Sequence, residues 1–82
     1  MIRKPLSGRM IGVSERLANV RLEPVMWAAL HDVARRKGCS VDDLVSEIDA
    51  ERERRKLGPA IRNHLVGYYR ESARRALENA RR

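Results

Sequence analysis

The chain has 82 residues, a formal net charge of +7 and a sequence pI near 10.7. This length suits one small domain, and such a basic balance favours nucleic acid, and after it anionic membrane, as a partner. One cysteine excludes an internal disulfide framework, and no apolar run approaches the ~20 residues that cross a bilayer, so we expect a cytoplasmic protein without a membrane partner.

The charge is distributed unevenly along the chain. Residues 1–22 hold five basic side chains and one acid, and residues 59–82 hold six arginines and two acids. Residues 40–50 hold four acids and no base. A surface selected only for solubility mixes its signs more evenly, so this pattern indicates two basic ends around an acidic middle.

Residues 1–14 contain Pro5, Gly8 and Gly12 and show no sustained apolar period. We predict that they form a flexible basic arm. From Glu15 to Leu22 the pattern becomes an alternation, which predicts a short strand. One face of that strand is apolar, and the other ends in two hydrogen-bonding side chains: Ala18, Val20 and Leu22 against Leu17, Asn19 and Arg21.

The predicted strand has no evident partner in the chain. An isolated strand leaves backbone N–H and C=O groups unpaired, which folded proteins rarely tolerate. The simplest remedy is the same strand from a second copy. The sequence therefore predicts a homodimer with an intersubunit, two-stranded antiparallel ribbon.

Two helices are predicted next. Pro24 suits a first helical position, an apolar stripe follows at helical spacing, and Gly38 suits the left-handed residue that ends such a helix. Ser40 reads as the N-cap of the second helix, with Asp43 at the third position of an approximate capping box. The two stripes are Trp27, Leu30, Val33 and Ala34, and then Val41, Leu44, Val45 and Ile48.

The end of the second helix and the rest of the chain leave alternatives open. Asp49 to Lys56 reads either as an exposed helical extension or as a frayed connector. Residues 57–82 form a third amphipathic helix whose first half docks on the core and whose second half is extended or frayed. The arginines there either contact phosphates or only add solubility: Arg70, Arg74, Arg75, Arg81 and Arg82.

Strand, helix, Gly-x-Ser turn and helix, in that order over residues 16–48, resemble the ribbon-helix-helix DNA-binding proteins. The early Trp27 and the third helix are similar to a bacterial subgroup of that family. The resemblance implies a mostly α fold with one short N-terminal strand, paired in an intertwined homodimer. It also implies a ribbon-helix-helix domain over residues 15–56 and an added C-terminal helix over residues 57–82.

Residue roles follow from the same resemblance. The ribbon would lie in the DNA major groove and present Leu17, Asn19 and Arg21 to base edges, where arginine suits guanine and asparagine suits adenine. The turn before the second helix would hold a phosphate. The phosphate contacts would be Lys37, Ser40, Val41 and Arg16, and the dimer core would be Val20, Leu22, Trp27, Leu30, Leu44 and Ile48.

The resemblance implies sequence-specific binding of double-stranded DNA by a small transcriptional regulator, most simply a repressor. The alternative is an antitoxin or an adaptor that binds a protein partner through residues 57–82. No nucleophile–base pair, metal-ligand spacing or Gly-rich phosphate loop appears in the sequence, so we expect neither catalysis nor a cofactor nor a metal.

Overall fold

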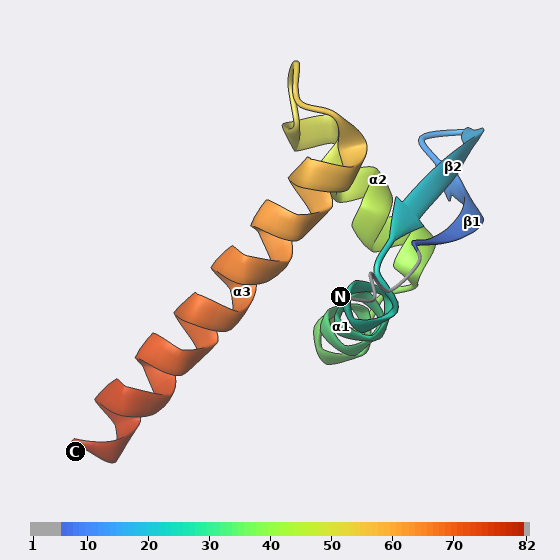
Figure 1. The fold of residues 1–82 in the computed structure, drawn as a ribbon. Coiled ribbons are helices and arrows are strands. Elements are labelled where there is room, and N and C mark those ends of the chain that lie inside the picture. Colours follow the sequence, from blue (N-terminus) through green and yellow to red (C-terminus); the bar gives the residue numbers. More distant parts are fainter. Residues whose placement is uncertain (1–5, 82) are drawn as a thin grey trace.

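The protein is described by a computed structural model that covers residues 6–81. Two strands are followed by three helices: β1 (Ser7–Val13), β2 (Arg16–Leu22), α1 (Pro24–Lys37), α2 (Val41–Glu51) and α3 (Leu57–Ala80). Figure 1 shows the strands at one side of α2 and α3 at the other, with α1 below them. The ribbon-helix-helix order is confirmed, and it is followed by a third helix.

The ribbon is built within one chain. β1 pairs antiparallel with β2 in a register that runs from Ser7 opposite Leu22 to Val13 opposite Arg16. Residues 7–14 are therefore not an arm, which corrects the prediction for 1–14; residues 1–5 of that segment lie outside the described residues. The missing partner strand is β1, so the pairing of β2 does not require a second subunit.

The residue types of β1 explain why the sequence pattern did not predict this strand. Its inward positions end in Ile11 and Val13, which are buried, but Gly8 and Gly12 occupy alternate positions on the other face. Glycines at such spacing read as breaks in a strand. The hairpin turn is equally unmarked, because Ser14 and Glu15 adopt φ of 47° and 69° without the glycine or asparagine usual there.

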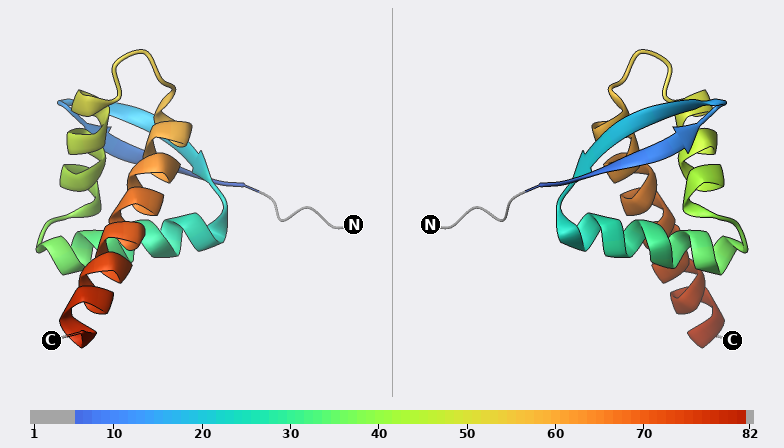
Figure 2. Two further views of the ribbon diagram at one scale, coloured as in Figure 1. Left: turned by 90° about the vertical axis from the view of Figure 1, so that its left-hand side faces the viewer. Right: turned by 90° about the vertical axis from the view of Figure 1, so that its right-hand side faces the viewer.

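A single core joins the ribbon to the helices. Figure 2 shows the hairpin on the side opposite the projecting part of α3. Inner side chains of both strands belong to the same core as those of the helices. The six residues predicted for a dimer core are all buried inside one chain: Val20, Leu22, Trp27, Leu30, Leu44 and Ile48. Their burial therefore needs no second subunit.

The helix ends follow the sequence signals. Pro24 stands in the first turn of α1, and Gly38 ends that helix in the left-handed conformation at φ 70°. The Cys39 N–H then donates to the Ala34 carbonyl at 3.0 Å. Ser40 and Asp43 form the predicted capping box of α2. Helix α2 stops at Glu51, so most of the charged segment up to Lys56 is a connector and not a helical extension.

Polar contacts attach α3 to α1 over its first half. The guanidinium of Arg62 donates two hydrogen bonds to the Glu23 carboxylate, at 2.8 and 3.3 Å. The Tyr69 hydroxyl donates to Asp32 at 2.8 Å. Helix α3 buries Ala60, Ile61 and Leu65 and then continues past Tyr69 away from the body (Figure 1).

Candidate nucleic-acid interface

The outer face of the ribbon carries the predicted base-contacting residues. Leu17, Asn19 and Arg21 alternate along β2 with inward residues and are exposed. Across the ribbon they face Gly12, Met10 and Gly8, respectively. This outer face thus consists of six side-chain positions drawn from both strands, and we use the term reading face for those six.

Asn19 and Arg21 lean towards the same glycine. A Cβ atom placed on Gly8 would lie 3.2 Å from Asn19 Oδ1 and 3.5 Å from Arg21 Cγ. The absence of a side chain at Gly8 therefore leaves the room that these two side chains occupy. None of the ion pairs in the described part of the chain involves Arg21. An amide and a guanidinium consequently stand side by side on an exposed surface.

Both ends of the hairpin are fastened to helices. At the open end, the indole Nε1 of Trp27 donates to the Ser7 carbonyl at 2.7 Å, and the Arg9 guanidinium lies 5.0 Å from the centre of that ring. At the turn, the Ser14 N–H donates to the Ser46 hydroxyl at 3.1 Å. These contacts hold the ribbon at fixed positions on α1 and α2.

The predicted phosphate contacts are divided between two places. Lys37, Ser40 and Val41 lie at the α1–α2 turn, whereas Arg16 begins β2 beside the hairpin turn. Both cations of this set have acidic partners: Lys37 Nζ is 2.9 Å from Glu47, and Arg16 Nη2 is 3.6 Å from Asp49. All four residues remain at least partly exposed. A phosphate would have to compete with carboxylates for both cations.

Acidic groups also stand at the start of α2. The Ser40 N–H faces the Asp43 carboxylate at 3.5 Å within the capping box. A Cβ atom on Gly12 would lie 3.2 Å from Asp42 Oδ2, so that carboxylate stands beside the turn end of the ribbon. The positive group of the reading face is at the other end, because Arg21 is opposite Gly8.

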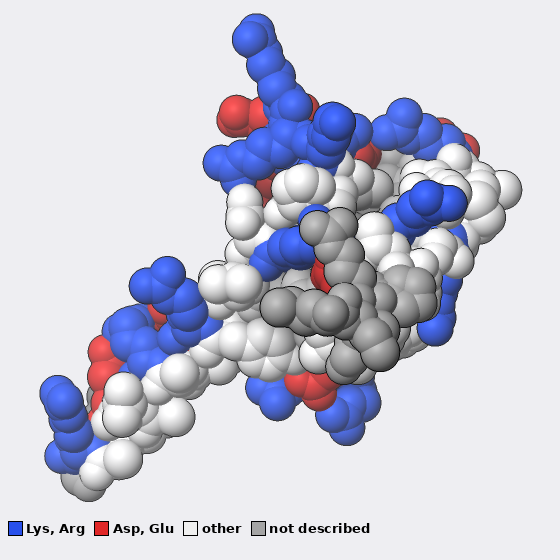
Figure 3. All heavy atoms as spheres, viewed as in Figure 1, with Lys and Arg blue, Asp and Glu red and all other residues white. Residues whose placement is uncertain are grey.

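Basic side chains are abundant elsewhere on the surface. Figure 3 shows them over the connector between α2 and α3, at the top of the view, and along the projecting part of α3. The connector supplies Arg52, Arg54, Arg55 and Lys56. On α3, Arg74 pairs with Glu71 and Glu78, and Arg75 pairs with Glu71. Part of the charge at the C-terminal end is thereby neutralised locally.

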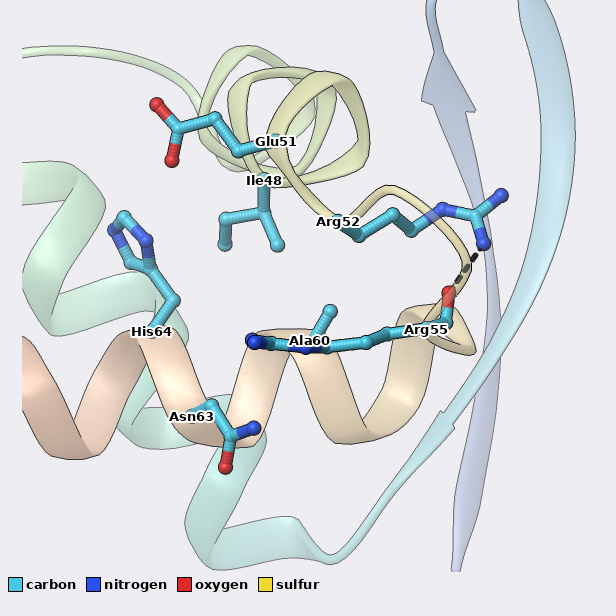
Figure 4. A pocket seen from close by; sticks show the side chains of 7 residues that line it. All are labelled: Ile48, Glu51, Arg52, Arg55, Ala60, Asn63 and His64. Atoms are coloured by element: carbon cyan, nitrogen blue, oxygen red, sulfur yellow. Dashed lines mark hydrogen bonds between the residues drawn. The ribbon is translucent and has the colours of Figure 1, made fainter.

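A shallow cavity of about 200 Å³ lies between the end of α2 and α3. Figure 4 shows Ile48 pointing from α2 towards α3 and His64 rising from α3 to one side of it, while Arg52 turns away and donates to the Arg55 carbonyl. Both signs of charge line it, since Glu51 is present with the two arginines. Over residues 6–81, no group of histidine, cysteine or acidic side chains is arranged to hold a metal ion.

Sequence reasoning missed Met10 and the two glycines of the reading face. Their signal was the inward pair Ile11 and Val13 at a two-residue spacing, together with the basic Arg9.

In the described helices, no segment is both long enough and apolar enough to cross a membrane.

The structure thus consists of an antiparallel ribbon packed on helices, with an exposed outer face that carries Asn19 and Arg21. The family model for the ribbon-helix-helix domain matches residues 6–69, and the chain belongs to that family. Domains of this family are generally DNA-binding transcriptional regulators or antitoxins, and they typically dimerise. No curated protein and no solved structure matched the chain.

Proposed function

We propose that this protein binds double-stranded DNA sequence-specifically by placing the reading face in the major groove. The observation that carries the proposal is the convergence of Asn19 and Arg21 over Gly8. A guanidinium donates two parallel hydrogen bonds to guanine, and an amide both donates to and accepts from adenine. A two-stranded ribbon has the width that the major groove admits.

The phosphate backbone would supply the remaining affinity. We propose that Lys37, Ser40, Val41 and Arg16 contact phosphates on either side of the ribbon. Lys37 and Arg16 would then exchange Glu47 and Asp49 for phosphate oxygens. Such contacts make binding strongly salt-dependent without selecting a sequence. Replacement of Lys37 by alanine should therefore weaken all sequences alike and reduce the salt slope by about one.

The protein would act as a homodimeric transcriptional regulator, most simply a repressor, in the cytoplasm of a bacterium, bound to the nucleoid. One reading face offers two strong base-reading side chains, and two copies related by a two-fold axis would read a palindromic site. The core of one chain is closed, so a dimer would join subunits that are already folded. Mass measurements with and without the selected DNA test this proposal; one chain per site would contradict it.

Selection of bound sequences from random DNA tests the base reading. The parent chain should enrich a site with guanine at the position read by Arg21, and Arg21→Ala should lose that preference. The same experiment with Arg70→Ala provides a matched control, since Arg70 is an exposed residue of α3, the helix that extends away from the ribbon (Figure 1). Enrichment of the same guanine by Arg21→Ala would refute the proposed mode of binding.

A second function is favoured by the projecting part of α3. This segment extends past the core and exposes Leu77, at 62% of its surface. An antitoxin or adaptor would cover such a helix with a protein partner, so residues 57–82 are the alternative binding surface. Specific capture of one protein, abolished by Leu77→Asp and retained by Arg21→Ala, would favour that alternative.

A further inference from the structure

The reading face has an apolar half that hydrogen bonding to bases leaves unexplained. Met10 is opposite Asn19 and Leu17 is opposite Gly12, so Met10 and Leu17 are diagonal neighbours across the two strands. They are 61% and 73% exposed. Gly12 contributes no side chain opposite Leu17, and the Asp42 carboxylate of α2 lies beside Gly12 at the turn end of that face.

We propose that Met10 and Leu17 read thymine by packing against its 5-methyl group, an inference that rests on the proposed major-groove binding. The methyl group distinguishes thymine among the four bases in the major groove, where it meets apolar side chains. Polar base edges opposite Met10 or Leu17 would lose water without gaining a hydrogen bond. The two side chains therefore favour thymine by attraction and disfavour the other bases by desolvation.

Geometry sets the order of the bases in the site. Positions on one face of a strand are about 6.6 Å apart, and successive base pairs are about 3.4 Å apart. Arg21 lies at the open end of the ribbon, Asn19 and Met10 share the middle, and Leu17 lies near the turn. Each half-site should thus have guanine at one end and thymine towards the other, with adenine or thymine between them.

Glycine makes this contact possible. With Gly8 and Gly12 on the same face as Met10, β1 contributes a single side chain to the reading face. The space over Gly8 is occupied by Asn19 and Arg21, and the Asp42 carboxylate of α2 lies where a Gly12 Cβ would point. Larger residues at both positions would displace these neighbours and stand beside Met10 on the reading face. A second copy of this chain is the competing occupant of the apolar patch, and the experiment below separates the two.

The experiment replaces thymine by deoxyuridine, one position at a time, in the site selected by the parent chain. The substitution removes the methyl group and leaves base pairing unchanged. We expect about fourfold weaker binding at a contacted thymine, the effect of burying roughly one methyl-sized group. Met10→Ala and Leu17→Ala should each abolish the effect of the uracil substitution at one position. Asn19→Ala should retain that effect at the position read by Leu17. Thermal melts check that each variant folds.

Four outcomes would overturn the inference. If specific binding depends on Arg21 but is unchanged by every uracil substitution, the methyl contact is refuted and the proposed function stands. A selected site without thymine at the ribbon has the same consequence. Absence of any selected sequence refutes both. If Leu17→Ala lowers the molecular mass of the protein in solution and binding remains equally sensitive to loss of the thymine methyl group, Met10 and Leu17 contact a second copy of the chain and not thymine.

Discussion

Arg21 and Asn19 lie in different surroundings from the cations that pair with acids in the described part of the chain. Lys37, Arg16 and Arg62 each lie beside a carboxylate, whereas Arg21 lies over a glycine. A side chain without an acidic partner keeps its donors available for a ligand, and Gly8 leaves the room that Asn19 and Arg21 occupy. At the scale of residues, the function of this face thus depends on Gly8 as well as on the groups that would touch DNA.

The role of Gly8 can be tested by Gly8→Ala. Alanine in a strand interior should raise the free energy of unfolding by about 0.5–1 kcal/mol relative to glycine. Its Cβ would stand 3.2 Å from Asn19 Oδ1, so the amide must move, and the preference at the base read by Asn19 should weaken. Urea unfolding and DNA selection measure the two effects. A variant that is more stable and retains the parent's full preference would show that Gly8 does not position Asn19.

At the scale of elements, the hairpin carries backbone strain and the helices do not. Ser14 and Glu15 both have positive φ in a two-residue turn, where a glycine or asparagine would fit without strain. The strain is tolerated because the turn is bonded to Ser46 on α2 and both strands bury their inner faces. The ribbon is therefore held by its neighbours more than by its own turn.

Replacement of Glu15 by glycine should relieve this strain. A residue forced into the left-handed conformation costs roughly 1–2 kcal/mol, so Glu15→Gly should increase the stability of the chain by about 1 kcal/mol. Lys56→Gly provides the control, because Lys56 has an ordinary φ of −67° and glycine there adds only chain entropy. Both are compared by their urea midpoints. Equal destabilisation by the two substitutions would contradict a strained turn.

The attachment of α3 to α1 should depend on pH. Hydrogen bonds from Arg35 and then from Tyr69 lower the pKa of Asp32 below its ordinary 3.8, and burial and Asp32 raise the pKa of Tyr69. A carboxyl whose folded-state pKa is depressed stabilises the fold fully above its unfolded pKa. That contribution is lost as the pH falls below about 3.8.

Asp32→Asn should therefore flatten the loss of stability between pH 5 and pH 2 relative to the parent, and Glu51→Gln, an exposed acid away from this contact, serves as control. The pH values are chosen to lie about one to two units on either side of the ordinary Asp pKa. Urea unfolding at several pH values gives the comparison. Parallel pH profiles for the parent and Asp32→Asn would show that the contact contributes nothing to stability.

At the scale of the whole molecule, local signals gave the helices and missed the first strand. The 3.6-residue stripes, Pro24, Gly38 and the Ser40–Asp43 box are local, and α1 and α2 formed where they indicated. The pairing of β1 with β2 was hidden because glycines occupy two outward positions of β1. Without β1, the pattern of β2 indicated a strand that needed a second subunit to pair with.

The sequence predicted only part of the candidate site, because periodicity within one strand is a local signal and pairing between strands is not. Alternation along β2 placed Leu17, Asn19 and Arg21 on one exposed face, as observed. The places of Met10 and Gly8 beside Asn19 depend on the cross-strand register, which no periodicity within one strand reveals. The ion pairs of Lys37 and Arg16 likewise join residues from separate elements.

The most direct test of base reading by the ribbon is the affinity of the selected DNA site for the parent chain and for Arg21→Ala, measured at one fixed salt concentration. We predict a loss of about 1–3 kcal/mol for Arg21→Ala on that site and little further loss when its guanine is changed. Arg70→Ala should weaken binding slightly and equally for the selected site and for the site with the changed guanine, because it removes only a distant charge. If Arg21→Ala binds the selected site as tightly as the parent does, the ribbon does not read DNA as proposed.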